Sequence, residues 1–163
     1  MIIIGIDPGL SGGIAVLDNN KVLELFDMPV MADGKKNKKQ LNSALLAKLI
    51  KEKTSNSSES AVIVEQVNAM PGQGVTSMFN FGQTFGAIKG ICATLELPIF
   101  FVRPSKWKKH FELINSSKDA SRTKAIEMYP NLAEKLSKKK DVNKSDAILI
   151  ARFYCETRLK EEN

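Results

Sequence analysis

The chain of 163 residues fits one domain, residues 1–163, and its hydrophobic fraction of 43% is enough for a real core. Lysine and arginine outnumber aspartate and glutamate by 24 to 18, and this net charge of +6 favours a polyanionic partner, nucleic acid first, over a basic enzyme without one. Two separate cysteines, Cys92 and Cys155, and a single histidine disfavour a zinc site. We expect both cysteines to be reduced core residues. No apolar run approaches the roughly 20 residues that span a bilayer, and the N-terminus lacks the basic region of a signal peptide. The composition therefore predicts a soluble cytoplasmic protein without membrane contact.

The first part of the chain predicts an antiparallel meander of three strands, over residues 2–7, 12–18 and 21–28. The first is a β-branched run, IIIGID, that stops at the turn signal Asp-Pro-Gly, and an Asn19-Asn20 turn joins the other two. A polar, lysine-rich loop over residues 32–39 follows. Leucines at helical spacing then predict a helix over residues 40–53.

The rest of the chain alternates strands and helices. Two further apolar runs predict strands over residues 61–67 and 99–102. The predicted helices are a long one rich in small residues, a short basic one and three near the C-terminus, over residues 76–97, 103–111, 121–129, 131–139 and 143–159. This order is typical of an α/β fold with a five-stranded mixed sheet, three antiparallel N-terminal strands and then parallel strands, flanked by helices.

Three carboxylates stand at positions where chemistry is expected. Asp7 and Glu65 each close an apolar strand, and strand ends face the crevices in which sites form in α/β sheets. Asp146 lies near the start of the last helix, with Asn143 on the same face. Converging carboxylates favour Mg²⁺ or Mn²⁺, and two such ions about 4 Å apart can activate water and stabilise the leaving oxygen of a phosphodiester. Taken singly, each acid has a structural alternative: a turn, a lysine pair or a helix-dipole contact.

Four segments in this order resemble the RuvC family of Holliday junction resolvases: IIIGIDPGLSGGIAVLD, VIVEQV, FNFGQTFGAIKGICATLELPIFFVRPSKWKK and KSDAILIARF. The resemblance covers most of the chain, and the EQVNAMPGQG loop is most similar to the phage and phage-like branch. It implies an RNase H-like fold, a homodimer and paired nicks across four-way or other branched DNA with two Mg²⁺ ions per site, in a bacterial or phage-infected cell. By the resemblance, Asp7 is the bridging metal ligand, Glu65 the second and Asp146 the last.

The chain departs from the family pattern at two places. The family usually has an acid or a histidine three residues before the final aspartate, where this chain has Asn143, so either the Asn143 amide oxygen or Asp141 completes the metal site. The better-known members also carry an aromatic residue after the EQV segment, which stacks on junction bases. This chain has Asn68 there, and Met70 or Phe79 is the candidate replacement.

Clusters of lysine predict phosphate contacts. The candidates are Lys106, Lys108, Lys109, Lys139, Lys140 and Lys144. Trp107, which the first three lysines flank, is expected to lie in the core. The alternative for these three lysines is the solvated face of an amphipathic helix, and for the others a solvated loop. The run Lys35, Lys36, Lys38 and Lys39 is interpreted as a mobile loop.

Gly82, Gly86 and Gly90 recur every four residues on the long helix, where each glycine costs about 1 kcal/mol relative to alanine. The row predicts a close approach to the sheet or to a second subunit. The only histidine, His110, is interpreted as a surface or capping residue.

Three functions compete for this sequence. The first is a metal-dependent endonuclease selective for branched DNA. The second, motivated by Asn143, is a non-catalytic module of the same fold that binds branched DNA. The third is an ATP-binding relative of actin and the sugar kinases, because IGIDPGLSGG is similar to their phosphate loop. Those proteins need two such lobes, so we expect no nucleotide cofactor.

Overall fold

The computed structural model describes residues 1–34, 38–66, 68–69 and 71–161. Five strands form one mixed sheet in the order β3-β2-β1-β6-β7. They are β1 (Ile2–Ile6), β2 (Gly13–Asp18), β3 (Lys21–Asp27), β6 (Ser60–Glu65) and β7 (Ile99–Val102). The first three are antiparallel neighbours, whereas β1, β6 and β7 run parallel. This arrangement confirms the predicted five-stranded sheet.

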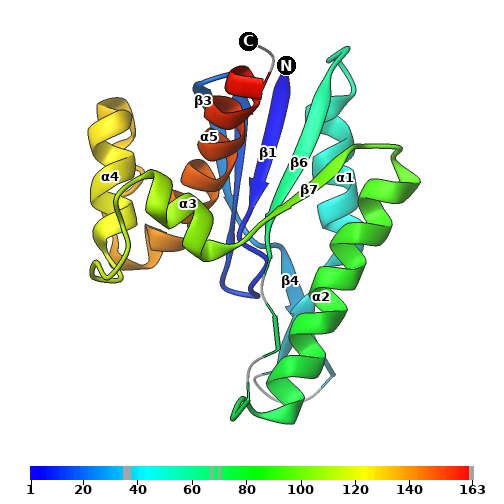
Figure 1. The fold of residues 1–163 in the computed structure, drawn as a ribbon. Helices are drawn as coiled ribbons and strands as arrows, with labels where there is room; N and C mark the ends of the chain where they lie inside the picture. The colour runs from blue at the N-terminus through cyan, green and yellow to red at the C-terminus, as the bar shows by residue number, and fades with distance from the viewer. Residues whose placement is uncertain (35–37, 67, 70, 162–163) are drawn as a thin grey trace.

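Helices cover both faces of the sheet (Figure 1). On one face lie α1 (Ser43–Thr54) and α2 (Val75–Thr94), and on the other α3 (Pro104–His110), α4 (Ala120–Met128) and α5 (Val142–Glu161). Side chains alternate along a strand, so Ile4 and Ile6 pack toward α1 and α2, and Ile3 packs with α5. Cys92 and Cys155 are buried free thiols, one in each core, as predicted.

Two predicted segments fold differently. The polar stretch over residues 32–39 was predicted as a loop, but its ends belong to a two-stranded hairpin, β4 (Val30–Ala32) paired with β5 (Lys39–Leu41). Lys35 and Lys36 lie outside the described residues. The helix predicted over residues 131–139 is replaced by two short 3-10 helices, η1 (Pro130–Leu132) and η2 (Lys139–Asp141). Buried Leu132 and Leu136 produce the helical spacing there, but they anchor only one turn, with the Leu136 N–H bonded to the Leu132 carbonyl.

The last helix crosses the sheet at very short range because two strand residues are glycine. A Cβ atom added to Gly5 of β1 would lie 2.2 Å from the Ala147 carbonyl oxygen, and one added to Gly13 of β2 would lie 2.7 Å from that of Asn143. Side chains at these positions would push α5 outward. The two glycines therefore bring the start of α5 against the end of β1.

Within the described residues, no helix combines the length and the apolar character that crossing a membrane requires.

Candidate metal and nucleic-acid site

Asp7 and Glu65 end neighbouring parallel strands at matching positions. Ile6 of β1 pairs with Val64 of β6. Asp7 directly follows Ile6, and Glu65 directly follows Val64 as the last residue of β6. Because alternation places Ile3 and Ile63 in the core beneath α5, Asp7 and Glu65, each an even number of residues further on, share that face. The apolar runs that predict the strands thus also predict that these two side chains are neighbours.

Asp146 joins them from the first turns of α5. The side chains beside it, Ser145 and Ala147, are fully buried. Ser121 of α4 hydrogen bonds the Asp146 carboxyl. The Oδ1 atom of Asp146 is buried and has no hydrogen-bond partner among the described residues. A buried carboxylate oxygen without a partner is costly in free energy, and a bound cation would relieve that cost.

The three acids form one electrostatic group. Burial raises the pKa of each, that of Asp146 to about 7. Repulsion adds to this effect, because Asp7 raises the pKa of Glu65, and both raise that of Asp146. Lys108 opposes the shift at all three carboxyls. A site that resists holding three negative charges is one that a divalent cation would stabilise.

The donor set fits a hard cation, although the acids do not surround one point. Among the described residues, no three acidic, histidine or cysteine side chains stand at metal-binding distances. Mutual repulsion between three carboxylates opposes their closer approach. A divalent ion bound between them would make the net electrostatic interaction attractive. The available groups are all oxygens, which Mg²⁺ and Mn²⁺ prefer. We therefore regard the three acids as a fit for such an ion.

Asn143 and Asp141 have different surroundings. The Asn143 side-chain amide donates to the Ser11 carbonyl, which holds it against the loop between β1 and β2 and leaves its amide oxygen as the possible ligand. Asp141 is buried, accepts the Lys138 N–H at 2.9 Å and pairs with Lys144 at 2.9 Å. These partners account for both of its oxygens. Asp141 therefore braces the start of α5, and Asn143 is the better candidate for the metal site.

The six candidate lysines separate into distinct environments. Lys108 is the one that interacts with all three acids, and its Nζ lies 5.3 Å from the centre of the Trp107 ring. Lys106, Lys109, Lys139 and Lys140 are exposed. Lys144 is mostly buried and lies 3.5 Å from Asp27 as well as beside Asp141, so its ammonium is already engaged. These ion pairs favour a structural role for Lys144.

Two side-chain contacts at the site were not predicted from the sequence. Trp107 is fully buried, as predicted, but its indole also donates a hydrogen bond to Glu65 at 2.9 Å. Ser121 bonds Asp146 from the predicted helix over residues 121–129. Neither lies near its partner in the sequence, so no spacing signal could have linked them. His110 was interpreted as a surface or capping residue, but it is partly buried and bonds Glu156 at 2.6 Å.

The fold and the placement of the acids define an RNase H-like α/β domain with carboxylates gathered at the carboxyl ends of β1 and β6. Among solved structures, the chain is similar to Thermus thermophilus RuvC in complex with a Holliday junction substrate, with a TM-score of 0.67 and 18% identity over 98% of this chain and 96% of that chain. A second Thermus thermophilus RuvC structure gives a TM-score of 0.58 at 18% identity, over 98% and 97% of the two chains. The chain therefore has a RuvC-like fold. No protein-family model and no curated protein matches the sequence.

Proposed function

We propose that this protein is a metal-dependent endonuclease that cuts branched DNA. The observation that carries the proposal is the buried Asp146 oxygen that lacks a partner among the described residues, in a carboxyl whose pKa is raised by burial and by the neighbouring charges of Asp7 and Glu65. The likeness of the fold to a junction-bound RuvC supports a branched substrate. Membership of the phage-like branch is part of the proposal and rests on the EQVNAMPGQG loop.

The proposed site holds up to two Mg²⁺ or Mn²⁺ ions on Asp7, Glu65 and Asp146, with Asn143 as an accessory oxygen ligand. When bound, such ions would activate a water molecule and stabilise the leaving oxygen of the phosphodiester. The chain's own residues supply the oxygens and hold them in place on rigid strand and helix ends. Lys108, beside the acids, would bind the phosphate next to the cut, and exposed Lys106, Lys109, Lys139 and Lys140 would contact phosphates further along. Lys144 would contribute less to DNA binding, because its ammonium already pairs with Asp27 and Asp141.

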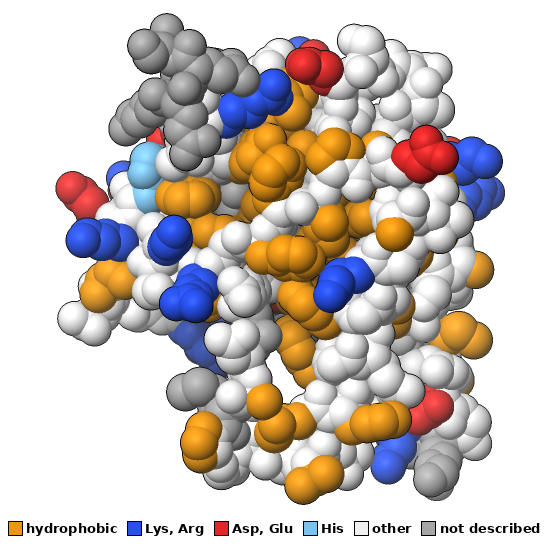
Figure 2. Space-filling model, turned by 45° about the vertical axis from the view of Figure 1, so that its right-hand side comes forward, with side chains coloured by type: hydrophobic (Ala, Val, Ile, Leu, Met, Phe, Trp, Pro, Cys, Tyr) orange, Lys and Arg blue, Asp and Glu red, His pale blue; other side chains and the backbone are white. Residues whose placement is uncertain are grey.

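Paired nicks need two active sites, and we propose that α2 joins two copies of the chain. A Cβ atom added to Gly82, Gly86 or Gly90 would meet nothing within 4 Å, so close packing against the sheet, one of the two predicted explanations of the row, is wrong. Hydrophobic side chains gather on the face that carries α2 and β7 (Figure 2). Phe101 of β7 is 39% exposed and contacts Phe85 of α2, with ring centroids 5.2 Å apart. A second copy packed on this face would bury these rings and explain the open glycines.

The test is a cleavage assay on four-way, Y-shaped and linear duplexes of matched sequence, with Mg²⁺, with Mn²⁺ and with chelator. The proposal expects metal-dependent nicks in the four-way or Y-shaped DNA and little cutting of the linear duplex. Equal cutting of all three substrates would contradict the selectivity, and absence of cutting with either metal would contradict the nuclease. The role of Phe79 in base stacking is tested in the same assay with Phe79→Ala. Met70, the other candidate, lies outside the described residues.

The second candidate function is a non-catalytic module that binds branched DNA. The observation in its favour is Asn143, which is uncharged and already bonded to Ser11. This alternative expects tight binding of the four-way junction with no nicks in either metal. Replacement of Asn143 by aspartate would then create or increase cleavage, whereas an active wild-type protein excludes the alternative.

A further inference from the structure

Helix α3 is a short brace whose inner face carries one large residue. It begins with Pro104, which is favourable at the first helical position, and it spans only seven residues. Trp107, in its middle, is fully buried. An indole N–H is a donor that cannot accept, so a buried one needs an acceptor. The acceptor here is Oε1 of Glu65, at 2.9 Å, which is 42 residues away in the sequence.

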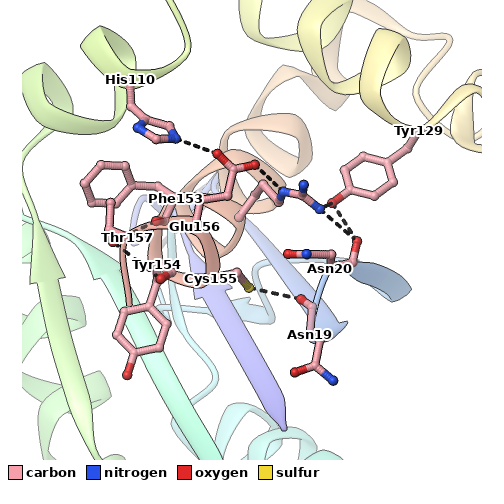
Figure 3. Close-up of polar contacts among 10 residues, drawn as sticks. Asn19, Asn20, His110, Tyr129, Phe153, Tyr154, Cys155, Glu156 and Thr157 are labelled. Atoms are coloured by element: carbon pink, nitrogen blue, oxygen red, sulfur yellow. Dashed lines mark hydrogen bonds and ion pairs between the residues drawn. The ribbon is translucent and has the colours of Figure 1, made fainter. Parts of the chain in front are cut away.

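The far end of the brace is attached to α5 (Figure 3). His110 bonds Glu156 through Nε2 at 2.6 Å, and the Arg152 guanidinium bonds the other Glu156 oxygen at 2.5 Å. The His110 ring also meets the Phe153 ring edge-on, with centroids 5.2 Å apart. Since α5 also carries Asp146, α3 connects the helix that bears one acid to the strand that bears another.

Within the part of the chain that the structure describes, Oε1 of Glu65 accepts the Trp107 N–H and Oε2 has no hydrogen-bond partner. A carboxylate at a strand end rotates readily about its side-chain bonds, and the nearby negative charge of Asp7 favours rotation away from the site. A donor fixed on Oε1 opposes that rotation. We propose that Trp107 is a positioning residue, which fixes the Glu65 carboxylate through its indole N–H so that the second oxygen faces the metal ions. This inference rests on the proposed metal-dependent function.

The competing explanation is that Trp107 only fills the core, in which case its N–H is incidental. The two explanations differ in a single atom, and the chain contains one tryptophan, so changes to tryptophan affect this position alone. Replacement of tryptophan by benzothienylalanine, which has sulfur in place of the N–H, keeps the size and shape of the ring. Trp107→Phe is the genetic counterpart, and Phe111→Leu is a matched control that disturbs packing at the end of the same helix.

The first measurement is calorimetric binding of Mn²⁺ and Mg²⁺ to the folded protein without DNA. Loss of a residue that hydrogen bonds a metal ligand typically lowers metal affinity by about 10- to 100-fold. We expect a loss of that size in both the benzothienylalanine protein and Trp107→Phe. Phe111→Leu should bind within about twofold of wild type. An unchanged metal affinity in the benzothienylalanine protein would overturn the inference, even if Trp107→Phe fails to fold.

The second measurement follows the single indole N–H signal by nitrogen–proton correlation NMR during a Mg²⁺ titration. We expect this signal to shift with the midpoint found by calorimetry and to move in Glu65→Gln. On a junction substrate, loss of the N–H should lower kcat with little change in KM. If calorimetry shows metal binding while the indole signal stays fixed, the inference fails and the proposed nuclease survives. If wild-type protein binds no metal at all, both fail.

Discussion

Gly5 of β1 and Ala147 of α5 lie so close that a Cβ atom on Gly5 would come within 2.2 Å of the Ala147 carbonyl oxygen. Asp7 follows Gly5 by two residues, and Asp146 directly precedes Ala147. The contact between the strand and the helix therefore sets the distance between the two acids.

Gly5→Ala should displace α5 and loosen the acidic cluster. Added volume in a packed contact typically costs about 1–3 kcal/mol, and we expect a loss of that size in the free energy of unfolding measured with urea. The control is Gly74→Ala, because a Cβ there would have only Ser77 Oγ nearby, at 3.9 Å, and Gly74 has a φ of −62° that alanine adopts without strain. Gly74 is the N-cap of α2, where alanine is less favourable than glycine, so that variant should lose at most about 1 kcal/mol. A Gly5→Ala protein as stable as the control would contradict the close approach.

Asp146 should make the stability of the metal-free protein fall as pH rises. Its pKa is raised from 3.8 to about 7, so the folded state holds the proton more tightly than the unfolded state does. This favourable contribution is present in full below about pH 4 and is lost as pH rises through about 7. Asp146→Asn has no such proton, so at about pH 8 in chelator it should be more stable than wild type, by at most about 4 kcal/mol.

The comparison is made by urea unfolding of both proteins over this pH range, with and without Mg²⁺. Mg²⁺ should stabilise wild type far more than Asp146→Asn and so reduce the difference between them. Parallel pH profiles for the two proteins in chelator would show that Asp146 titrates normally and would remove this part of the account.

Lys108 should lower the pH at which the three acids lose their protons. It lowers the pKa of all three, so Lys108→Gln should raise them further. Deprotonated ligands would then be available only at higher pH, and the acidic limb of the pH–rate profile for cleavage should move upward. The matched control is Lys48→Gln, because Lys48 is an exposed residue of α1 whose ion-pair partner is Glu52. If Lys108→Gln cleaves DNA with the acidic limb of its pH–rate profile unchanged, Lys108 does not influence the pKa values of the acids.

The glycine row should control assembly. Gly86→Leu places a large side chain where a Cβ meets nothing within 4 Å in one chain, so the isolated fold should tolerate it. If a second copy packs there, the variant should sediment as a monomer at concentrations where wild type is a dimer, and paired nicks should become single ones. Identical sedimentation of the two proteins would place any dimer contact elsewhere.

Much of the fold follows from local patterns in the sequence. The apolar runs ending at Asp7 and Glu65 predict both the strands and the shared edge at which the acids meet, because alternation and parallel pairing are regular. The strand over residues 99–102 is bounded by Pro98 and the basic segment that follows it, and β7 has those bounds. The hairpin of β4 and β5 gives no such signal, because each of its two strands has only three residues, too few for an alternating pattern, and both are mostly exposed.

The supporting contacts of the site were beyond prediction for a different reason. Trp107 to Glu65, Ser121 to Asp146 and His110 to Glu156 each join residues far apart in the chain. Only the packing of α3 and α4 against α5 brings them together. Residue type explains why Trp107 is buried, but it does not reveal which acceptor its N–H meets.

The most direct test of the account is cleavage of a four-way junction in Mg²⁺ by wild type and by Asp7→Asn, with junction binding measured in parallel. Asp7 contributes a carboxylate to the proposed metal site. Among the described residues, the hydrogen bond that its side chain makes is the one it accepts from the Gly9 N–H. The account predicts that wild type nicks the junction, whereas Asp7→Asn binds it with similar affinity and leaves it intact. Cleavage by Asp7→Asn at the wild-type rate would contradict the central claim.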